Sequence, residues 1–144
     1  MTALVDNENI LSLIPQRDPF VLIDELIERT DLICTTSFNI KEGHILVANG
    51  CLSAEGLIEN IAQTAAAGVG YEYQYVKKTK PPIGYIGAVS KLVINGIPPA
   101  GSMIKTTVEV TNKIMNVTII SGSVFLQDKL LAKCEMKIFI NEET

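Results

Sequence analysis

The side chains best suited to chemistry lie on one largely apolar stretch in the middle of the chain, residues 53–75. In a helix each residue turns the chain by about 100°, so Glu59 and Gln63, four residues apart, both flank the apolar stripe. A carboxylate held beside an apolar surface can act as a general acid or base on a bound substrate. The amide of Gln63 can orient that carboxylate or a substrate amide, or it can bond a strand carbonyl instead. The alternative is that Glu59 is a solvated glutamate on the helix surface with no functional role.

Two groups ahead of this stretch can serve as a partner for the carboxylate. His44 is the single histidine and precedes Glu59 by fifteen residues, and Cys51 stands just before the expected start of the helix. A neutral imidazole is a competent base near pH 7, whereas an ordinary thiol is mostly protonated there. The alternative for His44 is a loop histidine with no functional role, and the alternative for Cys51 is a small hydrophobic residue that packs in the protein interior.

The stretch itself predicts a helix with one broad apolar face. Ser53 is a good N-cap, and Glu55 places a carboxylate in the first turn, where the helix dipole favours it. Seven apolar residues fall within an arc of about 140°: Leu57, Gly68, Ile61, Ala65, Ile58, Val69 and Ala62. Because many of them are small, we expect a sheet to lie close against this face and to curl around the helix.

Composition limits the class of protein. The 144 residues are 47% hydrophobic and 19% charged, which predicts one globular domain over residues 1–144. A net charge of -4 and an isoelectric point near 5.0 argue against nucleic acid and membrane surfaces as partners. The three cysteines lack the spacing of metal ligands, so we expect reduced thiols in a cytoplasmic protein, with no metal and no other cofactor.

The remaining segments predict strands and turns. A short helix is expected at 10–14, ended by Pro15. Strands are expected at 20–28, 32–40, 44–48, 83–94, 104–111, 116–127 and 132–140. One helix cannot cover both faces of a sheet. The sequence therefore predicts an α+β fold in which an antiparallel sheet of roughly five or six strands wraps one long central helix and continues into a partner subunit.

Three groups of residues resemble a known family. They are Glu59-Asn60-Ile61-Ala62-Gln63 on the helix, Leu13 to Phe20 followed by Ile23-Asp24, and Tyr85-Ile86-Gly87 with Pro98 to Gly101. Together they resemble the 3-hydroxyacyl-(acyl carrier protein) dehydratases of the hot-dog fold. The chain is also similar to the divergent dehydratase-like proteins found with aryl-polyene and flexirubin pigment synthesis. The resemblance implies dimers whose active sites form between subunits.

The resemblance also assigns roles. It implies elimination of water from a 3-hydroxyacyl thioester, with Glu59 as the helix carboxylate and His44 as the partner group. A second alignment leaves Cys51 where the family has its histidine. Gln16 stands where the family has another histidine. The family also has a Pro-Gly pair at the start of the helix, which this chain lacks, and Gly56 is the glycine nearest to that position.

The candidate site therefore has two parts. The catalytic candidates are Glu59 and His44. The substrate-binding candidates are Gln63, Gly56, Cys51 and Gln16.

Two other functions stay open at this stage. In a hot-dog thioesterase, Glu59 alone would activate water against the thioester carbonyl, and no histidine would be needed. In a catalytically weak partner subunit, the chain would bind the carrier or pair with an active dehydratase. The expected partners are an acyl carrier protein or an acyl-CoA thioester and a second copy in a homodimer, which can assemble into a higher oligomer; nucleic acid and membranes are not expected.

Overall fold

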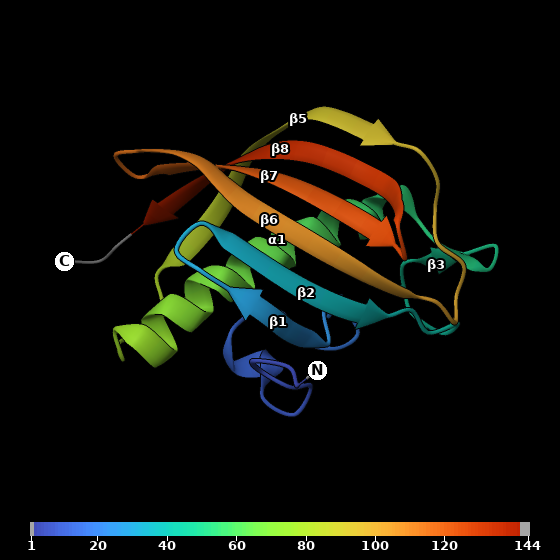
Figure 1. Ribbon diagram of the computed structural model, residues 1–144, viewed down its shortest axis with the longest axis horizontal. Helices are drawn as coiled ribbons and strands as arrows, with labels where there is room; N and C mark the ends of the chain where they lie inside the picture. Colours follow the sequence, from blue (N-terminus) through green and yellow to red (C-terminus); the bar gives the residue numbers. More distant parts are fainter. Residues whose placement is uncertain (1, 142–144) are drawn as a thin grey trace.

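A single long helix lies against one face of a six-stranded sheet in the computed structural model, which describes residues 2–141 (Figure 1). The sheet has the order β1-β2-β6-β7-β8-β5, and every neighbouring pair is antiparallel. Its strands are β1 (Glu25–Arg29), β2 (Ile33–Asn39), β5 (Ile83–Ile94), β6 (Met103–Ile114), β7 (Val117–Leu126) and β8 (Lys129–Asn141). The expected α+β fold, with an antiparallel sheet around one central helix, is confirmed.

The helix α1 (Ala54–Tyr71) begins where the sequence predicts. Ser53 caps it, because its Oγ accepts a hydrogen bond of 3.2 Å from the Gly56 N–H. A short hairpin precedes it, formed by β3 (Val47–Ala48) and β4 (Cys51–Leu52), with Asn49 and Gly50 at positive φ in the turn. After Tyr71 the helix widens into the π-helical turn η2 (Glu72–Val76). Across residues 2–141, no helix is long and apolar enough to cross a membrane.

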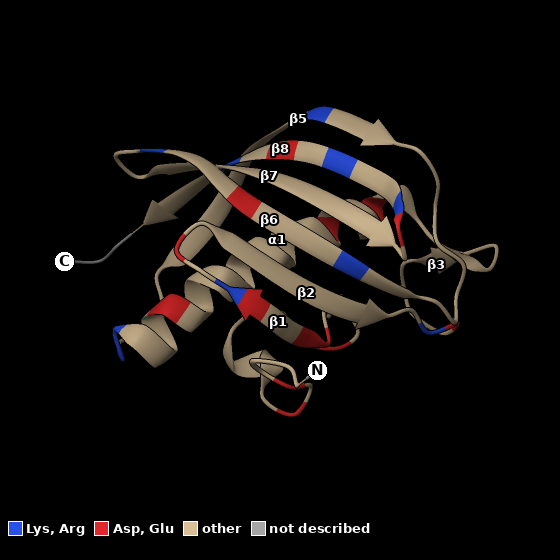
Figure 2. Cartoon of the chain, viewed as in Figure 1, with Lys and Arg blue, Asp and Glu red and all other residues tan. Residues whose placement is uncertain are grey.

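The core lies between α1 and the inner face of the sheet. On β6, buried Ile104 and Val108 alternate with exposed Lys105 and Glu109, so the charged side chains lie on the side facing away from α1. Figure 2 shows acidic and basic positions along β6. At Gly122 of β7 the helix lies so near the sheet that an added Cβ would stand 2.3 Å from Ile61 Cγ2. The helix can therefore lie against β7 only because residue 122 has no side chain.

The N-terminal residues cover the outer edge of β1. Val5 pairs with Leu26 of β1, and the 3₁₀ turn η1 (Ile10–Ser12) forms where a short helix was expected. Leu13 lies so close to the helix that a Cβ at Gly70 would stand 2.1 Å from the Leu13 carbonyl oxygen. At Leu26 the outer edge of β1 is therefore already paired and cannot bind another strand.

Strand β5 forms the opposite edge and is fully open. All of its twelve residues are exposed. Among them are seven large hydrophobic side chains: Ile83, Tyr85, Ile86, Val89, Leu92, Val93 and Ile94. A long, exposed, apolar edge strand is an unusual feature in a monomer, because it invites pairing with another chain.

Two expected strands are wrong in part. The strand expected at 20–28 begins only at Glu25, because the backbone of residues 20–22 bonds to side chains and not to a neighbouring strand. The strand expected at 44–48 is reduced to Val47–Ala48, because the Leu46 N–H turns back to the His44 ring. In both places side chains form the hydrogen bonds with the backbone that a neighbouring strand would otherwise form.

Candidate functional site

The carboxylate of Glu59 is held by the amide of Gln63 one turn further along α1. Gln63 Nε2 donates to Glu59 Oε1 over 3.1 Å and to the Phe20 carbonyl oxygen over 2.8 Å. Gln63 Oε1 accepts from the Leu22 N–H over 2.7 Å, and the whole side chain is buried. Gln63 therefore makes both kinds of contact considered from the sequence. It holds the Glu59 carboxylate, and it also forms hydrogen bonds with the backbone of Phe20 and Leu22.

Asn60 is a second buried amide, which the sequence reasoning did not single out. Its Nδ2 donates to the Leu22 carbonyl oxygen over 2.8 Å, and its Oδ1 accepts from the hydroxyl of Thr106 on β6. The Thr64 hydroxyl donates to the Asn60 carbonyl oxygen and shares a hydrogen bond of 2.7 Å with Thr36. This network fixes the rotation of α1 between residues 20–22 and the sheet.

The buried face of α1 therefore differs from the expected one. Asn60, Gln63 and Thr64 are fully buried, whereas four of the seven members of the expected face are only half-buried: Ile58, Ala62, Gly68 and Val69. The helix is rotated so that polar groups with distant backbone partners point inward. An apolar strip next to Glu59 is left partly open as a result.

His44 is half-buried and both of its ring nitrogens have backbone partners. Nε2 lies 3.0 Å from the Val21 carbonyl oxygen, and Nδ1 accepts from the Leu46 N–H over 3.1 Å. A carbonyl oxygen can only accept, so the pair of contacts assigns the proton to Nε2 of a neutral ring. This ring also packs against the Phe38 ring in a T-shaped arrangement, with the ring centroids 5.7 Å apart.

Residues 20–22 are held from two sides by these groups. The Val21 carbonyl oxygen bonds to His44, and the carbonyl oxygens of Phe20 and Leu22 bond to side chains of α1. Within one chain, His44 and Glu59 are therefore connected indirectly, through residues 20–22 and Gln63.

Of the other substrate-binding candidates, Gly56 and Cys51 have structural partners in the described part of the chain, whereas the side-chain oxygen of Gln16 does not. A Cβ at Gly56 would stand 2.6 Å from Leu52 Cδ1, and its N–H is used by the cap of α1. Cys51 is half-buried and pairs with Ala48 in the small hairpin. Gln16 is half-buried, and its Oε1 is a buried acceptor with no hydrogen-bond partner among residues 2–141.

The two fully buried thiols are poor nucleophiles. Burial raises the pKa of Cys34 to about 12, and its Sγ lies 3.3 Å from the Thr64 carbonyl oxygen. Burial also raises the pKa of Cys134. The described part of the chain contains no group of three or more His, Cys, Asp and Glu side chains that could hold a metal ion.

A long helix packed against one face of a six-stranded antiparallel sheet is the arrangement of the hot-dog fold. The model of the family described as "ApeP-like: ApeP dehydratase" matches residues 8–144. The chain therefore belongs to the ApeP-like dehydratase family.

Known proteins are similar to this chain in sequence or in fold. The 3-hydroxyacyl-[acyl-carrier-protein] dehydratase FabZ of Campylobacter fetus is 23% identical over 153 residues, which cover 95% of this chain and 98% of that protein. The dehydratase heterocomplex ApeI:P from Xenorhabdus doucetiae contains a chain of similar fold, with a TM-score of 0.83, 14% identity and coverage of 93% and 91%. A hypothetical thioesterase from Streptococcus pneumoniae, solved with coenzyme A, shares the fold at a TM-score of 0.66, with 11% identity and coverage of 83% and 86%.

Proposed function

We propose that this chain takes part in the elimination of water from a 3-hydroxyacyl group carried on an acyl carrier protein, in fatty-acid or polyene-type lipid synthesis. The observation that carries the proposal is the carboxylate of Glu59, half-buried beside an apolar strip and oriented by the buried amide of Gln63. Membership of the dehydratase family and the FabZ relative support the same reaction.

The reaction needs three groups. A base removes the proton on the carbon next to the thioester carbonyl, an acid protonates the departing hydroxyl, and donors hold the developing enolate oxygen. A C–H and a C–O bond break, a C=C bond forms, and water leaves. Glu59 is proposed as one member of the acid–base pair, because Gln63 fixes the direction of its carboxylate.

His44 is proposed as the second member, supplied by the other subunit of a dimer. To act as a base it must free a ring nitrogen, and in this structure Nδ1 accepts the Leu46 N–H. Binding of substrate would then have to replace that contact. The apo geometry of a catalytic hydrogen bond often differs from the geometry in the complex.

The occupied ring of His44 also favours a second candidate function, that of a partner subunit. A histidine whose two nitrogens hold backbone groups contributes no free base, so another chain would supply it. One solved structure of similar fold is itself a dehydratase heterocomplex, ApeI:P. The thioesterase alternative, in which Glu59 activates water alone, is supported only by likeness of fold.

We also propose that the chain assembles through β5. Pairing of β5 with β5 of a second copy, or of a related dehydratase chain, would cover an edge that is exposed over all twelve residues. The three free thiols fit the reducing conditions of the cytoplasm, where we propose that the protein works.

The test is incubation of the purified chain with 3-hydroxyacyl carrier proteins of several chain lengths. A 2-enoyl product is expected, and Glu59→Gln should lower turnover by about 10² to 10⁴. Glu55→Gln is the matched control, because Glu55 is an exposed carboxylate in the first turn of the same helix. Free acid without enoyl product would assign a thioesterase, and no product at any length would favour the partner subunit.

A further inference from the structure

Residues 20–22 form a short segment whose three carbonyl oxygens each accept a hydrogen bond from a side chain. The donors, in chain order, are Gln63 Nε2 at 2.8 Å, His44 Nε2 at 3.0 Å and Asn60 Nδ2 at 2.8 Å. Gln63 also holds the Glu59 carboxylate, and His44 is the proposed second member of the acid–base pair. The 20–22 segment therefore contacts both halves of that pair, and its position determines theirs.

Asn60 fixes this segment to the sheet. A carbonyl oxygen can only accept, so Asn60 Nδ2 faces Leu22 and its Oδ1 faces the hydroxyl of Thr106 on β6, which must donate. The backbone carbonyl oxygen of Asn60 accepts from the Thr64 hydroxyl over 2.8 Å, and Thr64 shares a hydrogen bond with Thr36. Thr36 and Thr106 are paired across β2 and β6. One point of the sheet therefore holds both carbonyl oxygens of Asn60.

Packing alone does not require an amide at position 60. A leucine has nearly the same shape, but it would leave the buried Leu22 carbonyl oxygen without its donor. The 20–22 segment would then be held only by the side chains that act in the proposed site. A displacement of about 1 Å in the reacting groups can lower a rate by about 10². The contact between Asn60 and this segment therefore affects the alignment of the site as well as the stability of the fold.

We propose that Asn60 and Thr106 are positioning residues of the reaction. Thr106 fixes the amide of Asn60, and Asn60 fixes the 20–22 segment against the sheet. The segment in turn holds the His44 ring and the amide that orients Glu59. The inference rests on the proposed function, since it assigns His44 and Glu59 to the acid–base pair. In the proposed dimer these two groups of one chain belong to different active sites, so one segment aligns a group in each.

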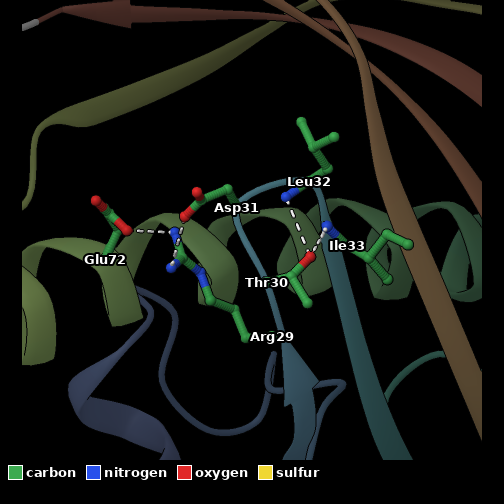
Figure 3. Close-up of polar contacts among 6 residues, drawn as sticks. All are labelled: Arg29, Thr30, Asp31, Leu32, Ile33 and Glu72. Atoms are coloured by element: carbon green, nitrogen blue, oxygen red, sulfur yellow. Dashed lines mark hydrogen bonds and ion pairs between the residues drawn. The ribbon is translucent and has the colours of Figure 1, made fainter.

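A second polar link between the helix and the sheet lies far from this segment and provides a comparison. Arg29, at the end of β1, places Nη2 2.5 Å from Glu72 Oε2 in η2, and its Nη1 lies 3.9 Å from Asp31 (Figure 3). Thr30 Oγ1 accepts from the two N–H groups of the β1–β2 turn and holds that turn in place. Glu72 follows Glu59 by thirteen residues, about 20 Å at the helical rise of about 1.5 Å per residue. The ion pair therefore ties the other end of the helix to the sheet.

The experiment observes His44 directly, because it is the single histidine of the chain. In protein labelled with ¹⁵N at histidine, NMR at about pH 8 measures how fast the Nε2–H exchanges with water, whether or not a substrate is turned over. Thr106→Val keeps the branched shape but removes the hydroxyl that fixes Asn60, so the exchange rate should rise about tenfold or more. Thr106→Ser restores a hydroxyl and should stay within about threefold of the wild-type rate. A wild-type Nε2–H that exchanges as fast as a free imidazole would overturn the inference.

Turnover gives the second readout. Thr106→Val should lower kcat for dehydration by about 10- to 100-fold and change KM by less than about threefold, because substrate still binds while the acid–base pair is displaced. Thr107→Val is the matched control, since Thr107 is the next residue of β6 and shares a hydrogen bond of 3.0 Å with Thr35 on the outer face of the sheet. Glu72→Gln is the control for a weakened link between helix and sheet. Both controls should change the exchange rate and kcat by less than about twofold.

A double variant covers a failure to fold. Should Thr106→Val not fold in a thermal melt, Asn60→Leu combined with Thr106→Val replaces both partners of the buried pair by apolar groups of similar shape, a change that is often nearly neutral for stability. The Leu22 carbonyl oxygen still loses its donor. The same rise in the exchange rate and the same fall in kcat are therefore expected.

The outcomes separate this inference from the proposed function. An unchanged exchange rate in Thr106→Val, or an equal rise in Thr107→Val or Glu72→Gln, would overturn the inference even in an active dehydratase. A rise in the exchange rate with unchanged kcat would also overturn it. A rise confined to Thr106→Val, in a protein that dehydrates no substrate, would support the positioning of His44 through Asn60 and contradict the proposed reaction.

Discussion

Gln63 links the proposed chemistry of this protein to its folding. One buried amide holds the Glu59 carboxylate and also satisfies the backbone of Phe20 and Leu22. A buried polar group left without its partner costs about 1 to 3 kcal/mol, so this position is strongly constrained before any catalytic demand is added. Loss of activity on changing Gln63 would therefore not by itself identify a catalytic residue.

His44 allows a sharper test, because glutamine can reproduce its two contacts. The amide of His44→Gln can donate to the Val21 carbonyl oxygen and accept from the Leu46 N–H, but it cannot exchange a proton near pH 7. If His44 is catalytic, His44→Gln should fold normally and lose dehydration by about 10² or more in a steady-state assay.

The opposite result identifies a structural histidine. His44→Gln would then keep its activity, whereas His44→Ala would lower the free energy of unfolding by about 1 to 3 kcal/mol in urea titrations. Full activity in His44→Gln would remove His44 from the proposed pair and leave Glu59 as the proposed catalytic residue of this chain.

Cys34 should make stability depend on alkaline pH. Burial raises its pKa from the ordinary 9.0 to about 12, so the folded state holds the proton where the unfolded state releases it. The stabilisation is complete below about pH 9 and is lost as the pH rises toward about 12, by up to about 4 kcal/mol. Urea unfolding of the reduced protein between pH 8 and about 11 should show this slope.

Cys34→Ala should flatten that slope. Comparison of its slope with the wild-type slope removes the contribution of the lysine and tyrosine side chains, which both proteins share. An equal slope in wild type and Cys34→Ala would contradict the expected role of the buried thiol.

At the scale of elements, the contact of α1 with β7 should depend on Gly122. Gly122→Ala places a methyl group 2.3 Å from Ile61 Cγ2, so the helix must shift or the side chain must move. We expect the free energy of unfolding to fall by about 1 to 3 kcal/mol, measured by urea denaturation.

A double-mutant cycle checks the cause. Ile61→Ala removes the group that clashes, so Gly122→Ala should cost much less in that background, with a coupling energy of about 1 kcal/mol or more. Gly43→Ala serves as the control, because an added Cβ there meets nothing within 4 Å. Strictly additive effects of the two changes would show that the helix is not held at this contact.

At the scale of the whole molecule, the open β5 edge should decide the oligomeric state. We expect the wild-type chain to be a dimer in light scattering, or to purify with a related dehydratase chain. Leu92→Glu places a charge on this edge and should weaken the assembly at least tenfold. Leu4→Glu is the control, since Leu4 is 45% exposed and Leu92 is 44% exposed.

A monomeric wild-type protein at working concentration would contradict assembly through β5. Equal weakening by Leu4→Glu and Leu92→Glu would place the interface elsewhere. A stable mixed complex with a second dehydratase chain, sensitive to Leu92→Glu alone, would support the partner subunit as the function of this chain.

The sequence by itself determined the elements and their order. The cap at Ser53, the Asn49-Gly50 turn and the alternation along the later strands are local signals, and the helix, the turn and the later strands formed close to their expected places. The family of the chain was also recognisable, because the Glu59–Gln63 motif is contiguous. Such signals depend on residues a few positions apart, which local backbone preferences and periodicity can express.

Only the tertiary structure decided which side of α1 is buried. Apolar periodicity favoured burial of the side with Ile58 and Val69. In the structure Asn60 and Gln63 point inward instead, because they form hydrogen bonds with the backbone of Phe20 and Leu22. These partners lie about forty residues away in the chain. The same contacts remove residues 20–22 from the expected strand. Hydrogen bonds between distant segments leave no local period in a sequence, and here they fix both the direction of Glu59 and the partly open strip beside it.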